Sequence, residues 1–146
     1  YPLFVVMEKT NARFILEFRD EINLVTIDSS FISLKTLLPV VKLWFTDPTS
    51  IVIALIKPQF EAGRKDAAKG EGVIRDPSIH KRILAEIIDF VTVSGFSVDG
   101  LVRSPLIGPK GNVEFLILLR NKPGDGDDLT DWIGGVFPEL EELRLP

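Results

Sequence analysis

The sequence predicts an α/β fold built on a mixed, mostly parallel β-sheet. Short apolar runs alternate along the chain with longer stretches of helical periodicity, which is the pattern of strand–helix–strand units. The runs at 23–27 and 51–56 are almost continuously apolar, as in strands that are covered on both faces. The last two runs are joined by a connection too short for a crossover helix, so one strand should run antiparallel to its neighbour.

Five runs are expected to form strands. They lie at 3–7, 23–27, 51–56, 97–103 and 113–119. The segment 104–112, between the last two runs, is rich in proline and glycine and should be a loop without a helix. This hairpin places the antiparallel strand near the far edge of the sheet.

A first helix is expected within 30–45, where the apolar residues fall roughly on one face. Ser30 or Ser33 can serve as its N-cap, because a side-chain oxygen there accepts a free backbone N–H. Pro39 lies in the interior of this segment and should kink the helix or delay its start.

The clearest helix is expected over 77–94, followed by the C-terminal cap Gly95. Asp76 is a suitable N-cap, and Pro77 occupies the first helical position, where its missing N–H costs nothing. His80 is expected on the exposed start of this helix. Beyond the strands, 121–131 is loop-like, and the apolar residues after it either dock on the fold or belong to a poorly ordered tail.

Composition limits the class of protein. The 146 residues are enough for one domain with a core. The absence of cysteine excludes disulfides and thiolate metal sites, and a lone histidine cannot build a metal cluster. No apolar run reaches the roughly 18 residues of a membrane span, and no secretory signal is recognised, so a cytoplasmic protein is expected.

Charge is unevenly distributed. A net charge of −4 argues mildly against a dedicated nucleic-acid domain. The acidity comes from 121–146, whereas 57–82 carries seven basic and four acidic residues. Within the basic segment 57–82, residues 63–75 include glycines and cations that could cradle a phosphate. Its spacing matches neither a P-loop nor a dinucleotide fingerprint, so the residues alone favour a flexible loop.

Three charged residues adjoin the apolar runs. Asp28 closes the second run, Lys57 follows the third and Glu114 interrupts the fifth. They should meet at the carboxyl edge of the sheet, where open α/β folds place ligands. Taken singly, Lys57 is a general base, an electrostatic stabiliser or a surface residue, Asp28 is a turn residue, and Glu114 is outward-facing or paired. A lysine between two carboxylates would satisfy all three.

Five segments, in order along the chain, resemble signatures of the hemolysin A (TlyA) family. They lie at 7–13 (Met-Glu-Lys-Thr-Asn-Ala-Arg), 27–34 (Ile-Asp-Ser-Ser-Phe-Ile-Ser-Leu), 55–64 (Leu-Ile-Lys-Pro-Gln-Phe-Glu-Ala-Gly-Arg), 72–77 (Gly-Val-Ile-Arg-Asp-Pro) and 108–115 (Gly-Pro-Lys-Gly-Asn-Val-Glu-Phe). The resemblance covers about residues 5–120. It implies a Rossmann-like methyltransferase fold of the FtsJ-like group, whose members use S-adenosylmethionine (SAM) to methylate ribose 2′-hydroxyls of ribosomal RNA.

The resemblance also implies roles for individual residues. Asp28, Lys57 and Glu114 correspond to the aspartate, second lysine and glutamate of the group's Lys-Asp-Lys-Glu catalytic set. Asp28 and Ser30, with Asn11 more weakly, are the residues expected to bind SAM. The cations expected to contact RNA are Arg64, Lys65, Lys69 and Arg75. No metal is implied.

The resemblance begins at the family's third strand. The first two strands, the glycine-rich SAM loop, the first lysine and the S4-like RNA-binding domain are not found, so a fold truncated at its N-terminus is expected. Residues 1–120 are then a partial FtsJ-like methyltransferase domain and 121–146 an acidic C-terminal tail. This chain is expected to be inactive alone, and an exposed sheet edge could pair two copies.

Two other functions remain open from the sequence. One is a non-catalytic binding or dimerisation module on an inherited Rossmann-like fold, which the missing glycine-rich loop favours. The other, which has less support, is a membrane-active hemolysin, because it would need an amphipathic or spanning segment and none is found in the sequence.

Overall fold

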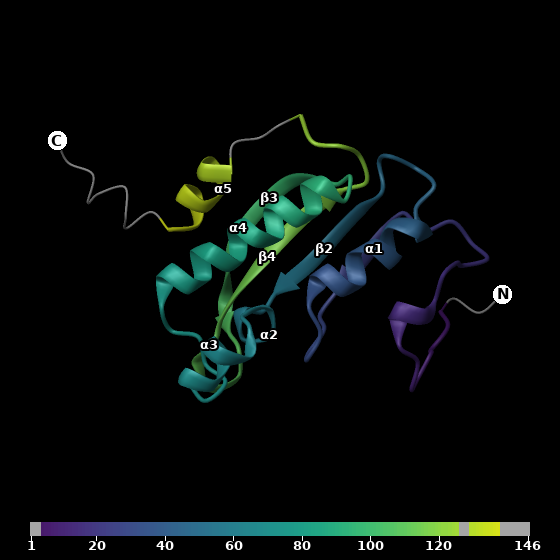
Figure 1. The fold of residues 1–146 in the computed structure, drawn as a ribbon. Coiled ribbons are helices and arrows are strands. Elements are labelled where there is room, and N and C mark those ends of the chain that lie inside the picture. The colour runs from purple at the N-terminus through teal and green to yellow at the C-terminus, as the bar shows by residue number, and fades with distance from the viewer. Residues whose placement is uncertain (1–3, 126–128, 138–146) are drawn as a thin grey trace.

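The computed structural model describes residues 4–125 and 129–137. Its centre is a four-stranded sheet in the order β1-β2-β4-β3, with the long helices α1 and α4 lying beside each other on one face (Figure 1). The strands are β1 (Leu24–Ile27), β2 (Ile51–Ile56), β3 (Ser97–Ile107) and β4 (Val113–Arg120). The α/β class is therefore confirmed.

Strand direction differs in part from the expectation. β1 and β2 are parallel, and β4 is antiparallel to both β2 and β3. The antiparallel strand near the far edge is confirmed, but the sheet is not mostly parallel in its pairing, because β4 inserts between β2 and β3. A short connection requires β3 and β4 to be neighbours, but it does not determine which of the two lies next to β2.

The prediction of a strand at 3–7 is wrong for the residues that the structure describes. Leu3 lies outside them, and 4–7 form no strand and are exposed. β1 instead forms one edge of the sheet. An apolar run becomes a strand only when its backbone groups find partners, and no strand of the described residues pairs with this one.

The core lies between the helices and one face of the sheet. Val52, Ala54 and Ile56 of β2 point into it, whereas Ile53 between them is exposed on the opposite face. Leu24 of β1 and Val102 of β3 are likewise exposed. The expectation that the strands are covered on both faces is therefore wrong for the described residues, because their helices form one layer.

Helix α1 (Leu34–Trp44) begins four residues later than the expected segment. Ser33, one of the two predicted caps, accepts a hydrogen bond from the backbone N–H of Lys35. Pro39 lies inside the helix and on its exposed side. The opposite side of the helix supplies its core residues, which are Leu34, Leu37, Leu38 and Val41.

Helix α4 (Pro77–Val93) confirms the clearest prediction. Asp76 accepts a hydrogen bond from the backbone N–H of Ser78, at 2.8 Å, and Gly95 follows the helix with a φ of 82°. The prediction for His80, which was expected to be exposed, is wrong. Only 4% of its surface is exposed, since position 80 lies on the same helical face as the core residues Ile83 and Leu84.

His80 binds the preceding segment. Its Nε2 lies 2.9 Å from the carbonyl oxygen of Ile74, which fixes Nε2 as the donor, and its ring meets the Phe115 ring at an edge. Burial lowers the pKa of His80 below its usual value, although the hydrogen bond to Ile74 raises it in part. The folded protein therefore holds a neutral imidazole here.

Stability should consequently fall in mild acid. Because the unfolded state binds the His80 proton more tightly, the contribution of the neutral imidazole is complete above a pH of about 6.5. It is lost as the pH falls from there through the lowered folded pKa. The free energy of unfolding in urea should change less between about pH 7.5 and about pH 5.5 in His80→Gln than in the wild type. Equal differences in the two proteins would contradict this role.

The remaining segments are more ordered than predicted. Two short helices follow β2, namely α2 (Pro58–Glu61) and α3 (Arg64–Lys69). Helix α3 lies inside the 63–75 segment that was predicted to be a flexible loop. The β3–β4 connection holds a single 3-10 turn, η2 (Pro109–Gly111), and another, η1 (Ala12–Phe14), precedes β1.

Helix α5 (Leu129–Val136) docks on α4 and β3, which was one of the two predicted alternatives. Val136 and Phe137 are buried in the core, whereas residues 138–146 lie outside the described part. Helix α5, which lies beyond the end of β4, thus adds to the core. In the described ranges, no helix is both long and apolar enough to cross a membrane.

Candidate functional site

The three predicted catalytic residues lie at one edge of the sheet. β1 and β2 are parallel and both end there, and β4 starts there because it runs in the opposite direction. Asp28 and Lys57 follow their strands directly, and Glu114 is the second residue of β4. The polarity of the strands therefore collects side chains that are far apart in the sequence.

Asp28 and Lys57 form an ion pair. The Lys57 Nζ lies 2.5 Å from Asp28 Oδ1. The lysine side chain is only 13% exposed, whereas the aspartate is 70% exposed. Most of the Lys57 side chain is thus buried, whereas its carboxylate partner is largely exposed.

Glu114 has a different partner from the one expected. It is only 7% exposed, and its Oε1 accepts a hydrogen bond from Gln59 Nε2 at 3.1 Å. Among the salt bridges of the described residues, Lys57 forms one with Asp28 and none with Glu114. The lysine therefore does not bridge both carboxylates, and the outward-facing alternative for Glu114 is wrong.

Lys57 and Glu114 nevertheless share a cavity of about 400 Å³. It is lined by Ser30, Phe31, Lys57, Gln59, Phe60, Gly72, Pro109, Lys110, Asn112 and Glu114. Its volume falls in the range of small-ligand sites. A cation and a carboxylate in such a largely apolar cavity can bind and polarise a hydroxyl group.

A second cavity, of about 720 Å³, adjoins the first. It is lined by Lys9, Thr10, Asn11, Ala12, Arg13, Ser29, Ser30, Phe31, Ile32 and Leu37. Two of the three predicted cofactor residues, Asn11 and Ser30, are among these, whereas Asp28 is adjacent to Ser29 and is not part of the lining. Ser30 and Phe31 line both cavities, so they form a common wall.

Phe31 was not identified from the sequence as a site residue. Its φ is 63°, in the left-handed region that costs a bulky residue energy, and 90% of its surface is exposed. Its ring lies 4.8 Å from that of Phe60, centroid to centroid. A large exposed aromatic held in a costly conformation points to a binding role, and its place in a serine-rich turn was the available signal.

Asn112 organises the loops around the cavity. Its Oδ1 accepts a hydrogen bond from the backbone N–H of Ile74, and its Nδ2 donates to the carbonyls of Gly72 and Pro109, all at 3.1 Å. One buried amide thereby ties 72–74 to the start of β4. The sequence did not reveal this role, because two of the partners are distant along the chain. Ile74 lies 38 residues away and Gly72 lies 40 residues away.

Gly108 allows Glu114 its position. A Cβ on Gly108 would lie 2.4 Å from Glu114 Oε1 and 2.8 Å from its Cδ. Only glycine leaves room for the carboxylate there.

The Gly108→Ala variant should therefore displace Glu114 from Gln59. Because the obstructed atoms are the end of a flexible side chain, we expect a stability loss of about 1–3 kcal/mol, the usual cost of breaking a buried hydrogen bond. Any reaction that uses Glu114 should slow far more than this loss of stability explains. The control is Gly135→Ala, where an added Cβ meets nothing within 4 Å. Identical rates for Gly108→Ala and the control would show that the position of Glu114 is unimportant.

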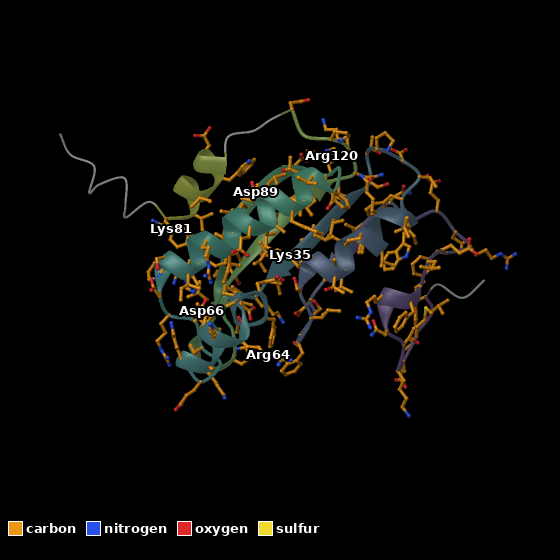
Figure 2. The ribbon with its side chains drawn as sticks, viewed as in Figure 1. Lys35, Arg64, Asp66, Lys81, Asp89 and Arg120 are labelled. Atoms are coloured by element: carbon orange, nitrogen blue, oxygen red, sulfur yellow. The ribbon has the colours of Figure 1, made fainter. Side chains whose placement is uncertain are left out.

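The four cations predicted to contact RNA are exposed. Arg64, Lys65 and Lys69 belong to α3, and Arg75 precedes α4. Figure 2 shows Arg64 and Asp66 in the region of α3, beyond the carboxyl end of β2. Arg82 donates a hydrogen bond to Asp66 at 2.7 Å, which lowers the pKa of that carboxyl and fastens α3 to α4.

Comparison with protein families matches residues 3–121 to the FtsJ-like methyltransferases. The "Putative rRNA methyltransferase YqxC" of Bacillus subtilis is 42% identical over 97% of this chain and 48% of its own length. The "16S/23S rRNA (cytidine-2'-O)-methyltransferase TlyA" of Mycobacterium tuberculosis is 37% identical over 83% of this chain and 45% of its own. The chain spans about half the length of these relatives.

Solved structures share the fold, and two of them are described as hemolysins. A "putative hemolysin" from Lactococcus lactis superposes with a TM-score of 0.78 at 37% identity, over 90% of this chain and 65% of that one. A protein from Streptococcus thermophilus, described in the same words, gives 0.77 at 36% identity, over 94% and 52%. The resemblance found in the sequence is confirmed: this chain belongs to the FtsJ-like methyltransferases of the TlyA/hemolysin family.

Proposed function

We propose that the protein containing this chain transfers a methyl group from SAM to a ribose 2′-hydroxyl of ribosomal RNA. The observation that carries the proposal is the Lys57–Asp28 ion pair beside a cavity that also holds Glu114. Relatives from Mycobacterium tuberculosis and Campylobacter jejuni are described as rRNA cytidine-2'-O-methyltransferases. Cytidine is accordingly the proposed target, and the cytoplasm, where such a substrate would be met, is the proposed location.

The cavity lined by Asn11 and Ser30 is proposed to bind SAM. Its volume and its mixture of polar groups with apolar Ile32 and Leu37 fit a ligand that combines a charged amino-acid end, a polar ribose and a flat, largely apolar adenine ring. When bound, SAM supplies a methyl group on a positively charged sulfur. The common wall of Ser30 and Phe31 then places that cavity directly next to the one that holds Lys57.

The proposed role of Lys57 is to activate the ribose hydroxyl. This oxygen is a weak nucleophile that must lose its proton as it attacks, so negative charge develops on it. A partly buried ammonium stabilises that charge more strongly than one in water. Asp28 keeps the ammonium in position, and Glu114 is placed to accept a hydrogen bond in the same cavity. In this role the hydroxyl proton passes to solvent. In the alternative role, Lys57 enters the step as the neutral amine and takes the proton itself as a general base.

RNA contacts are proposed for the cations of α3 and for Arg75. Exposed lysines and arginines bind phosphates without reading sequence, and they fix the orientation of the strand. Phe31 and Phe60, at the mouth of the cavity, are suited to stack on a base, because single-stranded RNA is commonly held by aromatic rings. Phe60 lines only the cavity that holds Lys57, so Phe60→Ala should weaken RNA binding without altering SAM binding.

SAM binding measured by calorimetry tests the proposal. The chain is compared with an extended form that includes the coding region upstream of Tyr1. We expect binding by the extended form and little or none by the chain alone, because the known relatives are about twice as long. Absence of binding by both forms would contradict the methyltransferase proposal.

A dimerisation module is a second candidate function. The exposed apolar residues Leu24, Ile53 and Val102 on the uncovered sheet face, and the edge strand β1, favour association with a second copy. Sedimentation equilibrium should detect a dimer if this is correct. A monomeric chain at all accessible concentrations would exclude it.

A further inference from the structure

Glu61 joins two loops of the site that are distant in sequence. It is the last residue of α2, and its carboxylate receives two short hydrogen bonds from the start of α1. Ser33 Oγ donates to Oε2 at 2.6 Å, and the backbone N–H of Leu34 donates to Oε1 at 2.7 Å. Both bonds are partly buried.

These bonds connect the segments that carry the proposed catalytic and cofactor residues. The loop before α1 carries Asp28, Ser30 and Phe31, and the segment after β2 carries Lys57 and Phe60. Two other contacts cross between them, namely the Lys57–Asp28 ion pair and the Phe31–Phe60 ring contact. One partner in each contact is largely exposed, namely Asp28 and Phe31. Solvent therefore screens the ion pair, and the ring contact buries little apolar surface.

The hydrogen bonds to Glu61 belong to a stronger class of interaction than these two contacts. A carboxylate that accepts from a backbone N–H and a hydroxyl makes charge-assisted hydrogen bonds. Leu34 is the first residue of α1, whose N–H has no partner inside the helix, and negative charge is favourable at this end. Ser33, besides donating to Glu61, accepts from Lys35, so the cap and the carboxylate form one network.

The network also borders the strained residue of the site. Phe31, with its positive φ, lies two residues before Ser33. Such a conformation persists only where the surrounding structure holds it. With Ser33 and Leu34 fixed on one side, and β1 on the other, the loop between them has little freedom to relax.

We propose that Glu61 is a positioning residue that holds the 28–33 loop against the segment carrying Lys57. It thereby keeps in place the wall of Ser30 and Phe31 that the two cavities share. This inference rests on the proposed function for its catalytic consequence, and on the hydrogen bonds alone for its structural consequence. Glu61 itself lines neither cavity.

The test compares Glu61→Ala with Glu61→Gln and with the control Asp47→Ala in the extended form. Asp47 also accepts from one backbone N–H and one hydroxyl, both of Thr49, but it precedes β2 at the opposite end of the sheet. Glutamine keeps one of the two acceptors, so it should rescue in part. Both alanine variants lose similar bonds, and they differ in whether those bonds join the site loops.

Two readouts separate the structural and catalytic parts. Hydrogen exchange of the 28–34 amides should quicken in Glu61→Ala and stay at the wild-type rate in Asp47→Ala. SAM affinity should fall about tenfold or more in Glu61→Ala, less in Glu61→Gln, and remain unchanged in the control, as expected for a lost charged hydrogen bond. Exchange over 28–34 that is the same in Glu61→Ala as in the wild type would overturn the inference. If the wild type itself fails to bind SAM, the proposed function fails, and the exchange result still decides the role of Glu61.

Discussion

Replacing Lys57 with methionine in the extended form should slow methyl transfer to ribosomal RNA by about 10²–10⁴-fold, the usual contribution of a group that assists a proton transfer. Methionine keeps the apolar stem of the side chain and removes the ammonium. The hydroxyl oxygen then develops its charge without a cation beside it, and Asp28 is left without its partner. Single-turnover transfer of labelled methyl groups from SAM measures the effect.

Stability should barely change in this variant. Because Asp28 is 70% exposed, water replaces the lost ion pair, and the cost should be about 1 kcal/mol or less. A loss of activity therefore cannot be attributed to unfolding. Lys35→Met is the matched control, since Lys35 also pairs with a carboxylate, that of Glu86, on the covering helices. A Lys57→Met protein as active as this control would show that the lysine has no chemical role.

The largest effect on folding is expected for Phe115→Ala. The Phe115 side chain in β4 has an exposed fraction of 0%, and its ring contacts those of His80 and Phe137. Removing a buried phenylalanine ring usually costs about 3–5 kcal/mol, through lost apolar burial and the cavity that remains. This is a large share of the free energy of unfolding of an ordinary domain, which is roughly 5–15 kcal/mol.

Denaturant unfolding of the wild type and the variant checks this value. Phe4→Ala makes the same chemical change at an exposed position and should alter the free energy of unfolding by about 0.5 kcal/mol or less. A Phe115→Ala cost no larger than that of the control would mean that the ring is not packed in the core.

The sequence was most informative where the determining interactions are local. The helix Pro77–Val93 could be predicted because its cap, first-turn proline and apolar spacing all lie within a few residues. The place of β4 between β2 and β3 could not, because it is decided by packing between distant segments. The run at 4–7 has the composition of a strand, and its state depends on a partner that the run itself does not specify.

The same distinction holds for the site. Asp28 and Lys57 could be brought together from the sequence, because parallel strands place their ends at one edge. Gln59, Glu61 and Asn112 were missed as contributors, since each acts through a hydrogen bond to a residue at least 27 positions away. His80 was misplaced because a helix start is usually exposed, and here the adjoining 72–76 segment covers it.

The most direct test of the account is the identity of the modified nucleoside. Ribosomal RNA is incubated with SAM and the extended form, digested, and analysed for methylated nucleosides by mass spectrometry. The account predicts 2′-O-methylcytidine with the wild type and far less of it with Lys57→Met. A SAM-binding wild type that forms no ribose-methylated nucleoside, or that methylates only bases, would contradict it.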